Sequence, residues 1–401
     1  MKIKLPRLNL RKIIKPDKHL PIIIILIILT VGGFYLSNNK ISSLESLIYN
    51  LTQQKDLNLT ELEKIGKELE TLKNQDQLKI NQELKSKIDN IQKTYNKAVT
   101  VYEKLLDLKS KTTKTADLDK AFSEFLTLLS KQDYDQADKK LSDLKKSILD
   151  ENAKITAAFT IPANVPENNS PPGAGYSRQQ VTTDVGTFMV SLIGADLGST
   201  RVVVDTASES DCSDNCPVLP LATYVSRNGA FAGVNGTYFC PASYPSCAGK
   251  TNTFDLLVMN KNKYYFNSSN NVYSNNPAVI FGAGYIRFVS ATSQWGRDTG
   301  VDGVLSNYPL LVQGGNVTFG GDDDPKKGSK GSRSFVANKG NSVYIGVVHN
   351  ATVAESARVM KALSMENVLN LDNGGSTALW SGGYKVGPGR HLPNAILFVR
   401  K

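Results

Sequence analysis

The first 36 residues change from a basic, polar pattern to a wholly apolar one. Residues 1–19 contain seven Lys or Arg against one Asp, and residues 20–36 contain no charged side chain. An uncharged run of this length reaches the lower limit for a helix that spans a bilayer, and the basic flank before it favours a cytoplasmic N-terminus. We therefore predict a basic cytoplasmic tail at 1–19 and a single-pass transmembrane anchor at 20–36.

The residues at the end of this run help to distinguish an anchor from a cleaved signal peptide. A signal peptide ends in a small-x-small cleavage site, whereas G-G-F-Y stands at 32–35, and no Cys nearby is available for a lipid. The sequence favours the uncleaved anchor. Every later residue is then expected on the extracytoplasmic side of the cell membrane.

Residues 38–150 have apolar positions at steps of three and four, which is the spacing of an amphipathic helix. The segment contains no Pro and one Gly, and its apolar stripe is interrupted near 74–78 and 109–116. We predict a coiled-coil stalk and then a helical hairpin with arms at 118–130 and 134–149. A homo-oligomer formed through the stalk and a monomeric antiparallel hairpin both fit these interruptions.

Pro, Asn, Ser and Gly dominate residues 163–175, so residues 158–178 are predicted to be a linker. In residues 179–401, turn residues separate short β-prone runs, among them 188–193, 201–204, 278–281, 342–348 and 368–371.

One helix is predicted within this domain, at 352–365, with Thr352 as its N-cap and Glu355 in a capping box. Because the helix lies between two predicted strands, we expect a βαβ unit with parallel neighbours and with Asp372 at the carboxyl end of the second strand. The predicted fold class is α+β: a transmembrane helix, a helical stalk and a C-terminal mixed α/β domain with a central sheet.

The formal net charge is +10, but more than half of it belongs to residues 1–19. The remainder of the chain shows no basic patch interleaved with aromatic residues. Nucleic acid is therefore not an expected partner, and the membrane surface accounts for the basic tail.

The four cysteines, Cys212, Cys216, Cys240 and Cys247, all lie in the C-terminal domain. An even number in an extracytoplasmic domain predicts two disulfides, and the sequence leaves three pairings open. Zinc is the competing interpretation, but C-x3-C with C-x6-C is poor spacing for a zinc site.

Four short motifs in this domain combine turn residues with groups that suit a polar ligand. N-L-D-N-G-G-S-T-A-L-W at 370–380 places Asp372 before a Gly-Gly turn and two hydroxyls, and glycine lets a backbone approach a ligand closely. N-G-T-Y-F at 235–239, Arg333 before a β-prone run, and R-x-x-x-N-A at 390–395 complete the set. Taken alone, the first motif also fits a strand-to-helix turn with a capping Ser.

In this order the motifs resemble the phosphodiester glycosidase family, of the N-acetylglucosamine-1-phosphodiester α-N-acetylglucosaminidase type, over residues 183–399. One residue departs from the family pattern, because Asn373 stands where the family usually has a third glycine. If that position requires a positive φ, Asn is the next best residue after Gly.

The resemblance implies a hydrolase that cleaves a sugar-1-phosphodiester bond in an envelope or exopolysaccharide glycan. The leaving phosphate is a weak base that needs charge stabilisation more than protonation, and a guanidinium suits phosphate. The implied catalytic residues are Asp372, which would activate water or stabilise the sugar cation, and Arg333. The implied substrate-binding residues are Asn235, Gly236, Tyr238, Gly374, Gly375, Ser376, Thr377 and Arg390.

Other interpretations stand beside this one. His349 ends a predicted strand and would suit an acid or base, although a lone His is more often structural. Ser376 with His349 or His391 would supply a serine-hydrolase triad, but G-G-S-T-A is not the G-x-S-x-G elbow. A non-catalytic envelope protein that holds a glycan or phosphoglycan is the alternative function.

No cofactor is firmly predicted, and the sequence leaves a divalent cation open. Three adjacent acids at 322–324 lack the alternate spacing of a calcium loop, so we expect them to be exposed.

Overall fold

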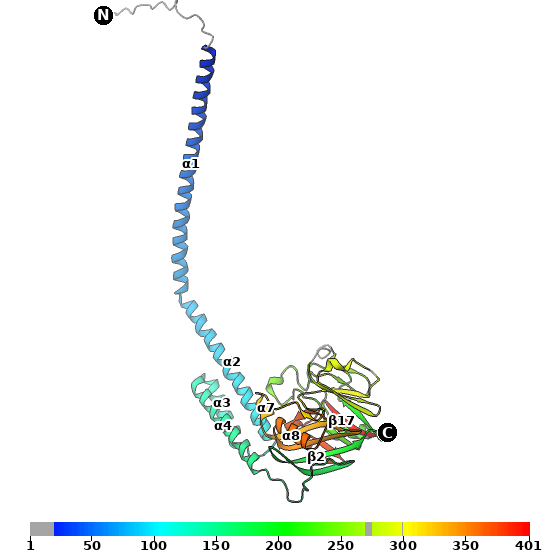
Figure 1. Cartoon of the computed structure of the whole chain (residues 1–401). Coiled ribbons are helices and arrows are strands. Elements are labelled where there is room, and N and C mark those ends of the chain that lie inside the picture. The colour runs from blue at the N-terminus through cyan, green and yellow to red at the C-terminus, as the bar shows by residue number, and fades with distance from the viewer. Residues whose placement is uncertain (1–19, 269–274, 299) are drawn as a thin grey trace, which may run out of the picture. The chain divides into compact units, whose positions relative to one another are not determined.

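The computed structural model describes residues 20–268, 275–298 and 300–401 (Figure 1), so the predicted tail at 1–19 lies outside the described residues. The chain divides into two compact units, Met1–Asp89 and Asn90–Lys401. Helices precede a sheet-rich C-terminal domain, which Figure 1 colours from green to red. This combination of a helical region with a sheet-rich domain confirms the predicted α+β class.

Helix α1 (Leu20–Lys73) dominates the first unit. It is long and apolar enough to be a candidate membrane span or signal sequence. Its apolar side chains beyond the predicted anchor are also exposed, and Leu62 has 71% of its surface accessible. The helix ends where the apolar pattern is interrupted, and α2 (Asp76–Lys109) begins after Asn74 and Gln75.

In the second unit, the end of α2 packs with α3 (Ala116–Ser130) and α4 (Tyr134–Ala158). Asp133 caps α4 by accepting a hydrogen bond from the backbone N–H of Gln136, at 3.2 Å. One apolar cluster joins the three helices and consists of Ala98, Val101, Leu105, Leu108, Phe125, Ala137, Leu141, Leu144 and Ile148. These three helices therefore bury their apolar faces against one another, whereas the apolar side chains of α1 are exposed.

Among the described residues the strands form three sheets, and every ladder between named strands is antiparallel. The first sheet has, in spatial order, β1 (Gly175–Thr183), β2 (Gly186–Asp196), β13 (Ser342–Ala351), β12 (Gly331–Lys339), β14 (Asn367–Asn373), β10 (Leu310–Gln313) and β11 (Asn316–Val317). The second has β16 (Tyr384–Val386), β15 (Leu379–Ser381), β4 (Ala232–Asn235), β17 (Asn394–Arg400) and β3 (Thr200–Thr206). The third has β6 (Tyr265–Phe266), β5 (Val258–Met259), β9 (Gly303–Ser306), β7 (Ala278–Gly282) and β8 (Tyr285–Val289).

Short helices connect these strands. They are α5 (Leu221–Arg227), η1 (Pro245–Cys247), η2 (Thr292–Trp295), α7 (Pro325–Gly328), α8 (Val353–Ala362) and η3 (Gly374–Ser376). Helix α8 begins as predicted, because the Thr352 side chain accepts from the backbone N–H of Glu355 and the Glu355 side chain accepts from that of Thr352.

The three sheets share one apolar core. Leu371 from the first sheet, Val234 from the second and Val279 from the third are fully buried in the same cluster. The apolar face of α8 joins a separate cluster on the first sheet. The first sheet is therefore covered by α8 on one face and by the other two sheets on the opposite face.

The βαβ pattern predicted that the strands before and after α8 are parallel neighbours. These strands are parallel, but they are not neighbours. β13 and β14 both pair antiparallel with β12, which lies between them. The inserted strand has a consequence for the site. Since it runs in the opposite direction, its first residues lie beside the last residues of β14, and Arg333 pairs in register with Asn373.

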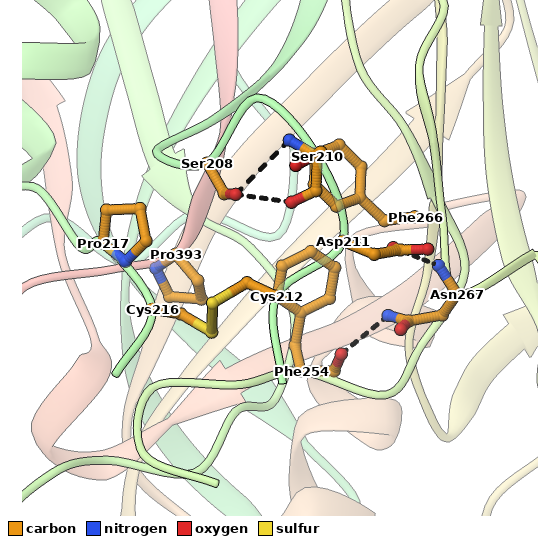
Figure 2. Close-up of a pocket in the computed structure, with 10 residues that line it drawn as sticks. All are labelled: Ser208, Ser210, Asp211, Cys212, Cys216, Pro217, Phe254, Phe266, Asn267 and Pro393. Carbon is orange, nitrogen blue, oxygen red and sulfur yellow. Dashed lines mark hydrogen bonds between the residues drawn. A yellow bond between two sulfur atoms is a disulfide. The ribbon is translucent and has the colours of Figure 1, made fainter. Parts of the chain in front are cut away.

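Both predicted disulfides are present, and the structure selects the pairing of sequence neighbours, Cys212–Cys216 and Cys240–Cys247. The first disulfide lines a small pocket with Phe254, Phe266 and Pro393 (Figure 2). The pocket holds about 10 Å³, which is room for one water at most. It shares no lining residue with the larger cleft described next.

Candidate active site

A cleft of about 520 Å³ opens where the end of β14 meets the start of β12. Its lining includes seven of the ten residues that the resemblance assigns to catalysis or substrate binding, which are Tyr238, Arg333, Asp372, Gly374, Gly375, Ser376 and Arg390. The opposite wall, the helical wall, comes from α2, the turn after it and α4, through residues such as Lys111 of that turn and Asn152 of α4. A volume of this size accommodates a disaccharide-sized ligand.

Asp372 is the buried carboxylate among the acids that line this cleft, and it is only 9% exposed. Burial raises its pKa to about 6, against the lowering effects of a hydrogen bond from Ser376 and of the Arg390 charge. The backbone N–H of Asn373 also donates to its Oδ1, at 2.8 Å. A carboxyl group with this pKa is ionised at neutral pH and still exchanges protons readily.

Asn235 fixes the backbone of Asp372 from within the core. Its Nδ2 donates to the Asp372 carbonyl at 2.7 Å, and its Oδ1 accepts from Ser334 Oγ at 2.8 Å and from the Ala378 N–H at 3.1 Å. The side chain is fully buried and does not line the cleft. Asn235 thus lies beneath the site, where it positions the carboxylate-bearing residue.

Gly236 contributes to the same support. Its carbonyl accepts from the Asp372 N–H at 2.9 Å, and a Cβ at this position would collide with the side chain of Asn394. Asn394, the Asn of the R-x-x-x-N-A motif, accepts from the Thr237 N–H at 2.9 Å. The N-G-T-Y-F and R-x-x-x-N-A motifs are therefore joined in the fold, although about 155 residues separate them in the sequence.

Asn373 does not occupy a glycine-like conformation. Its φ is −126° and its ψ is 176°, so the backbone is extended, and the positive φ falls on Gly374 instead, at 63°. The Asn373 side chain accepts from the Ser334 N–H at 3.0 Å and donates to Tyr238 Oη at 3.1 Å and to Asn370 Oδ1 at 3.2 Å. The departure from the family pattern thus adds a polar anchor and leaves the turn intact.

The remaining residues of the turn differ in what they face. Gly374, Gly375 and Ser376 line the cleft, whereas Thr377 is buried and donates to the Ser332 carbonyl at 3.4 Å. A Cβ on Gly375 would collide with the Arg390 guanidinium, so the glycine permits this side chain to approach Asp372.

Arg333 is 5% exposed and lines the cleft from the start of β12. Its Nε donates to the Ala351 carbonyl at 2.9 Å, and one Nη donates to the carbonyls of Lys326 and Ser329. Burial lowers the pKa of this guanidinium, although arginine remains charged in proteins. Arg333 therefore both supplies positive charge and holds down the loop that carries α7.

Sequence reasoning missed Tyr244, which connects Arg390 to the helical wall. The guanidinium of Arg390 lies over the Tyr244 ring, 5.2 Å from its centroid, and the Tyr244 hydroxyl donates to Asp107 of α2. Tyr244 stands in the loop closed by the Cys240–Cys247 disulfide, next to the N-G-T-Y-F motif. The sequence signal for this loop was the position of Cys240, which directly follows the N-G-T-Y-F motif.

His349 does not line the cleft. Its Nε2 lies 3.0 Å from Ser191 Oγ, and burial together with the nearby charge of Arg178 lowers its pKa to about 4. His391 is exposed, while Ser376 is 2% exposed. Ser376 instead hydrogen-bonds Asp372, an arrangement that holds a carboxylate in place.

The acidic run at 322–324 belongs to the loop that Arg333 holds. Asp324 caps α7 by accepting from the Lys326 N–H at 2.8 Å, and Lys327 pairs with Asp322 and Asp324. Within the described parts of the chain, no group of three His, Cys, Asp or Glu side chains is placed to hold a metal ion.

Residues 228–399 match the family model described as phosphodiester glycosidase. The resemblance seen in the sequence is thereby confirmed for the C-terminal part of the chain, and the match supports a hydrolase of this family. No curated protein matches the chain.

One similar solved structure is the catalytic domain of zebrafish N-acetylglucosamine-1-phosphodiester alpha-N-acetylglucosaminidase, auto-inhibited by its pro-peptide. Its sequence is 14% identical and the TM-score is 0.45. The match covers 59% of this chain and 87% of that one. A hypothetical protein from Synechocystis is also 14% identical, with a TM-score of 0.39, and the match covers 56% of this chain and 62% of that one. A putative exported protein from Burkholderia pseudomallei is 11% identical, with a TM-score of 0.35, and the match covers 53% of this chain and 74% of that one.

Proposed function

We propose that the chain hydrolyses a sugar-1-phosphodiester bond in the cleft that contains Asp372. The observation that carries this proposal is the placement of one buried carboxylate, with a pKa of about 6, beside two arginines in a single cleft. The family match at 228–399 supports the same class of reaction.

The arginines have a defined task in this reaction. When the bond between the anomeric carbon and oxygen breaks, the phosphate takes the electron pair and leaves as a monoester that still carries its second alcohol. Arg390 and Arg333 stabilise this developing charge, and they do so strongly because the cleft is partly desolvated. A phosphate leaving group needs little protonation, so the reaction does not require a second carboxyl group as a general acid beside the leaving oxygen.

Asp372 acts on the sugar side of the bond. As a carboxylate it removes a proton from an attacking water or stabilises the positive charge that develops at the anomeric carbon. Ser376 and the Asn373 N–H hold the carboxylate in one orientation. Asn235 fixes the backbone behind it, which in this proposal makes Asn235 a positioning residue.

The setting of the reaction follows from the N-terminal helix. With α1 as an uncleaved anchor and two disulfides in the C-terminal domain, we propose that the cleft faces a phosphodiester-linked glycan outside the cytoplasm. The same proposal includes a homo-oligomer formed through the stalk, because the apolar side chains of α1 are exposed.

The test measures free sugar released by the full chain from UDP-N-acetylglucosamine and from a methyl phosphodiester of N-acetylglucosamine 1-phosphate. Asp372→Asn should lower kcat by about 10²–10⁴, and Arg390→Lys should lower it as well because a point charge replaces the planar donors. Asp184→Asn is the matched control, since Asp184 is an exposed acid outside the cleft.

Equal rates for Asp372→Asn and the wild type would contradict the assignment of Asp372. A folded wild-type chain that binds these diesters and releases no sugar would contradict hydrolysis and favour a glycan-binding protein.

A further inference from the structure

We propose that the cleft takes a polyanionic glycan chain, with Lys111, in the turn after α2, forming a subsite for a second anionic group of the substrate. The inference rests on the proposed function and adds to it a second subsite, which would make the substrate a polymer with repeated negative charges. The ligand is a chain of sugars joined by phosphodiesters, in which one phosphate lies at Arg390 and another negative group lies at Lys111.

The helical wall lines the cleft with polar side chains that lie outside the sheet domain. The cleft that contains Asp372 is also lined by Lys104 of α2, by Lys111 of the turn that follows α2, and by Asn152 of α4. The sheet domain alone supplies the motif residues, so this wall offers contacts to a part of the substrate beyond the scissile bond.

The helical wall is held against the sheet domain by specific contacts within the second unit. Asp107 accepts from the Tyr244 hydroxyl, and Glu103 Oε1 accepts from the Ser246 N–H at 3.1 Å. Asn350 Nδ2 donates to the Thr156 carbonyl at 3.3 Å. These contacts lie at both α2 and α4, so the wall is a fixed part of the cleft.

The cleft has an excess of positive charge, since seven Lys or Arg side chains line it against four Asp or Glu side chains. Five of its cations form no salt bridge within the described parts of the chain: Lys104, Lys111, Lys326, Arg333 and Arg390. Among its acids other than Asp372, Asp107 and Glu103 accept the hydrogen bonds above, and Asp324 caps α7 and pairs with Lys327, so the cations outnumber the acids. A cleft lined by unpaired cations attracts and orients an anionic ligand.

Lys111 is the cation on the helical wall with the best-defined surroundings. Its Nζ donates to Asn152 Oδ1 at 2.9 Å, which leaves two of its three N–H donors for a ligand. The side chain remains open to solvent although protein surrounds its ammonium group. This crowding lowers the pKa of Lys111, and the charge of Arg333 lowers it further, while Asp107 opposes both. An anion between Lys111 and Arg333 would relieve their repulsion.

The test separates binding from turnover by using Asp372→Asn as the background. The probes are the methyl phosphodiester of N-acetylglucosamine 1-phosphate and an oligomer of three N-acetylglucosamine units joined by phosphodiesters. Calorimetry should give about tenfold tighter binding of the oligomer, because one charge-assisted hydrogen bond is added. Adding Lys111→Met should remove this preference and leave the affinity for the single diester within about twofold.

Two further variants are matched controls. Lys111→Arg keeps the charge and should retain the preference, and Lys145→Met removes an exposed lysine of α4 that does not line the cleft, so it should change nothing. Thermal unfolding of Lys111→Met should match that of its parent, since methionine preserves the apolar stem.

The outcomes distinguish this inference from the proposed function. Equal affinity for both probes, or an equal loss for both in Lys111→Met, overturns the subsite even when the wild type releases sugar. A preference that depends on Lys111 supports the subsite even when no sugar is released, and only the proposed hydrolysis then fails. Binding of a single-stranded oligodeoxynucleotide of equal charge as tightly as the oligomer overturns the assignment to a glycan.

Discussion

The Asp372 carboxyl group binds a proton more tightly in the folded chain than in the unfolded chain, because burial raises its pKa from 3.8 to about 6. Below pH 3.8 both states are protonated and the difference has no effect on stability. As pH rises from 3.8 to 6 the folded state loses stability, and above pH 6 the full penalty of about 2–3 kcal/mol is present.

Asp372→Asn is therefore expected to stabilise the fold by about 2 kcal/mol at pH 7.5 and by nothing at pH 3.5. Urea unfolding followed by the fluorescence of Trp295 and Trp380, which both belong to the C-terminal domain, measures the difference. A variant less stable than the wild type at pH 7.5 would show that the carboxylate is compensated in the fold. Asp184→Asn controls for the removal of one charge.

Replacing Asn373 by the glycine typical of the family should destabilise this chain. The substitution removes the three hydrogen bonds to Ser334, Tyr238 and Asn370, at a cost of about 1–3 kcal/mol, and adds backbone entropy to the unfolded state. Asn373→Ala separates these contributions, because it removes the bonds without the flexibility of glycine. The melting temperatures should follow the order wild type, Ala, Gly, and a glycine variant as stable as the wild type would refute this role.

At the scale of elements, the antiparallel β12 assembles the site. The sequence predicted both strands beside α8 and the capping box, because these depend on local periodicity and local hydrogen bonds. It did not predict that β12 would be inserted between them, since strand order depends on which faces are buried together. That insertion brings Arg333 next to Asn373.

We expect the two disulfides to contribute equally to the stability of the fold but differently to activity. Each closes a short loop and should contribute about 2 kcal/mol. The Cys240–Cys247 loop holds Tyr244 against Arg390, so Cys240→Ala with Cys247→Ala should reduce sugar release. Cys212→Ala with Cys216→Ala should leave the rate of the folded enzyme unchanged. Equal loss of activity in both double variants would show that the effect is one of folding alone.

At the scale of the whole molecule, α1 combines an apolar segment with a long exposed stripe. As an uncleaved anchor it should keep the full chain in the membrane fraction after an alkaline wash, and deletion of residues 1–37 should release the chain to the soluble fraction. Mass spectrometry of the membrane form should find the N-terminal residues. A mature chain that begins after the apolar segment would instead identify a signal peptide.

The sequence by itself determined the local elements and the chemistry of the site residues. The period of apolar positions specified helices and strands, the even cysteine count specified disulfides, and the motif around Asp372 pointed to the family whose model matches residues 228–399. These features depend on neighbours within a few residues, so a pattern along the chain is enough to predict them.

Only the tertiary structure decided which side chains meet. Asn235 lies beneath Asp372, and Asn373 replaces a glycine without a positive φ. A wall of the cleft comes from α2, with Asp107, and from the turn after it, with Lys111. Each of these features depends on contacts between segments that are far apart in the sequence. Such pairings are set by the packing of a shared core, which no local pattern records.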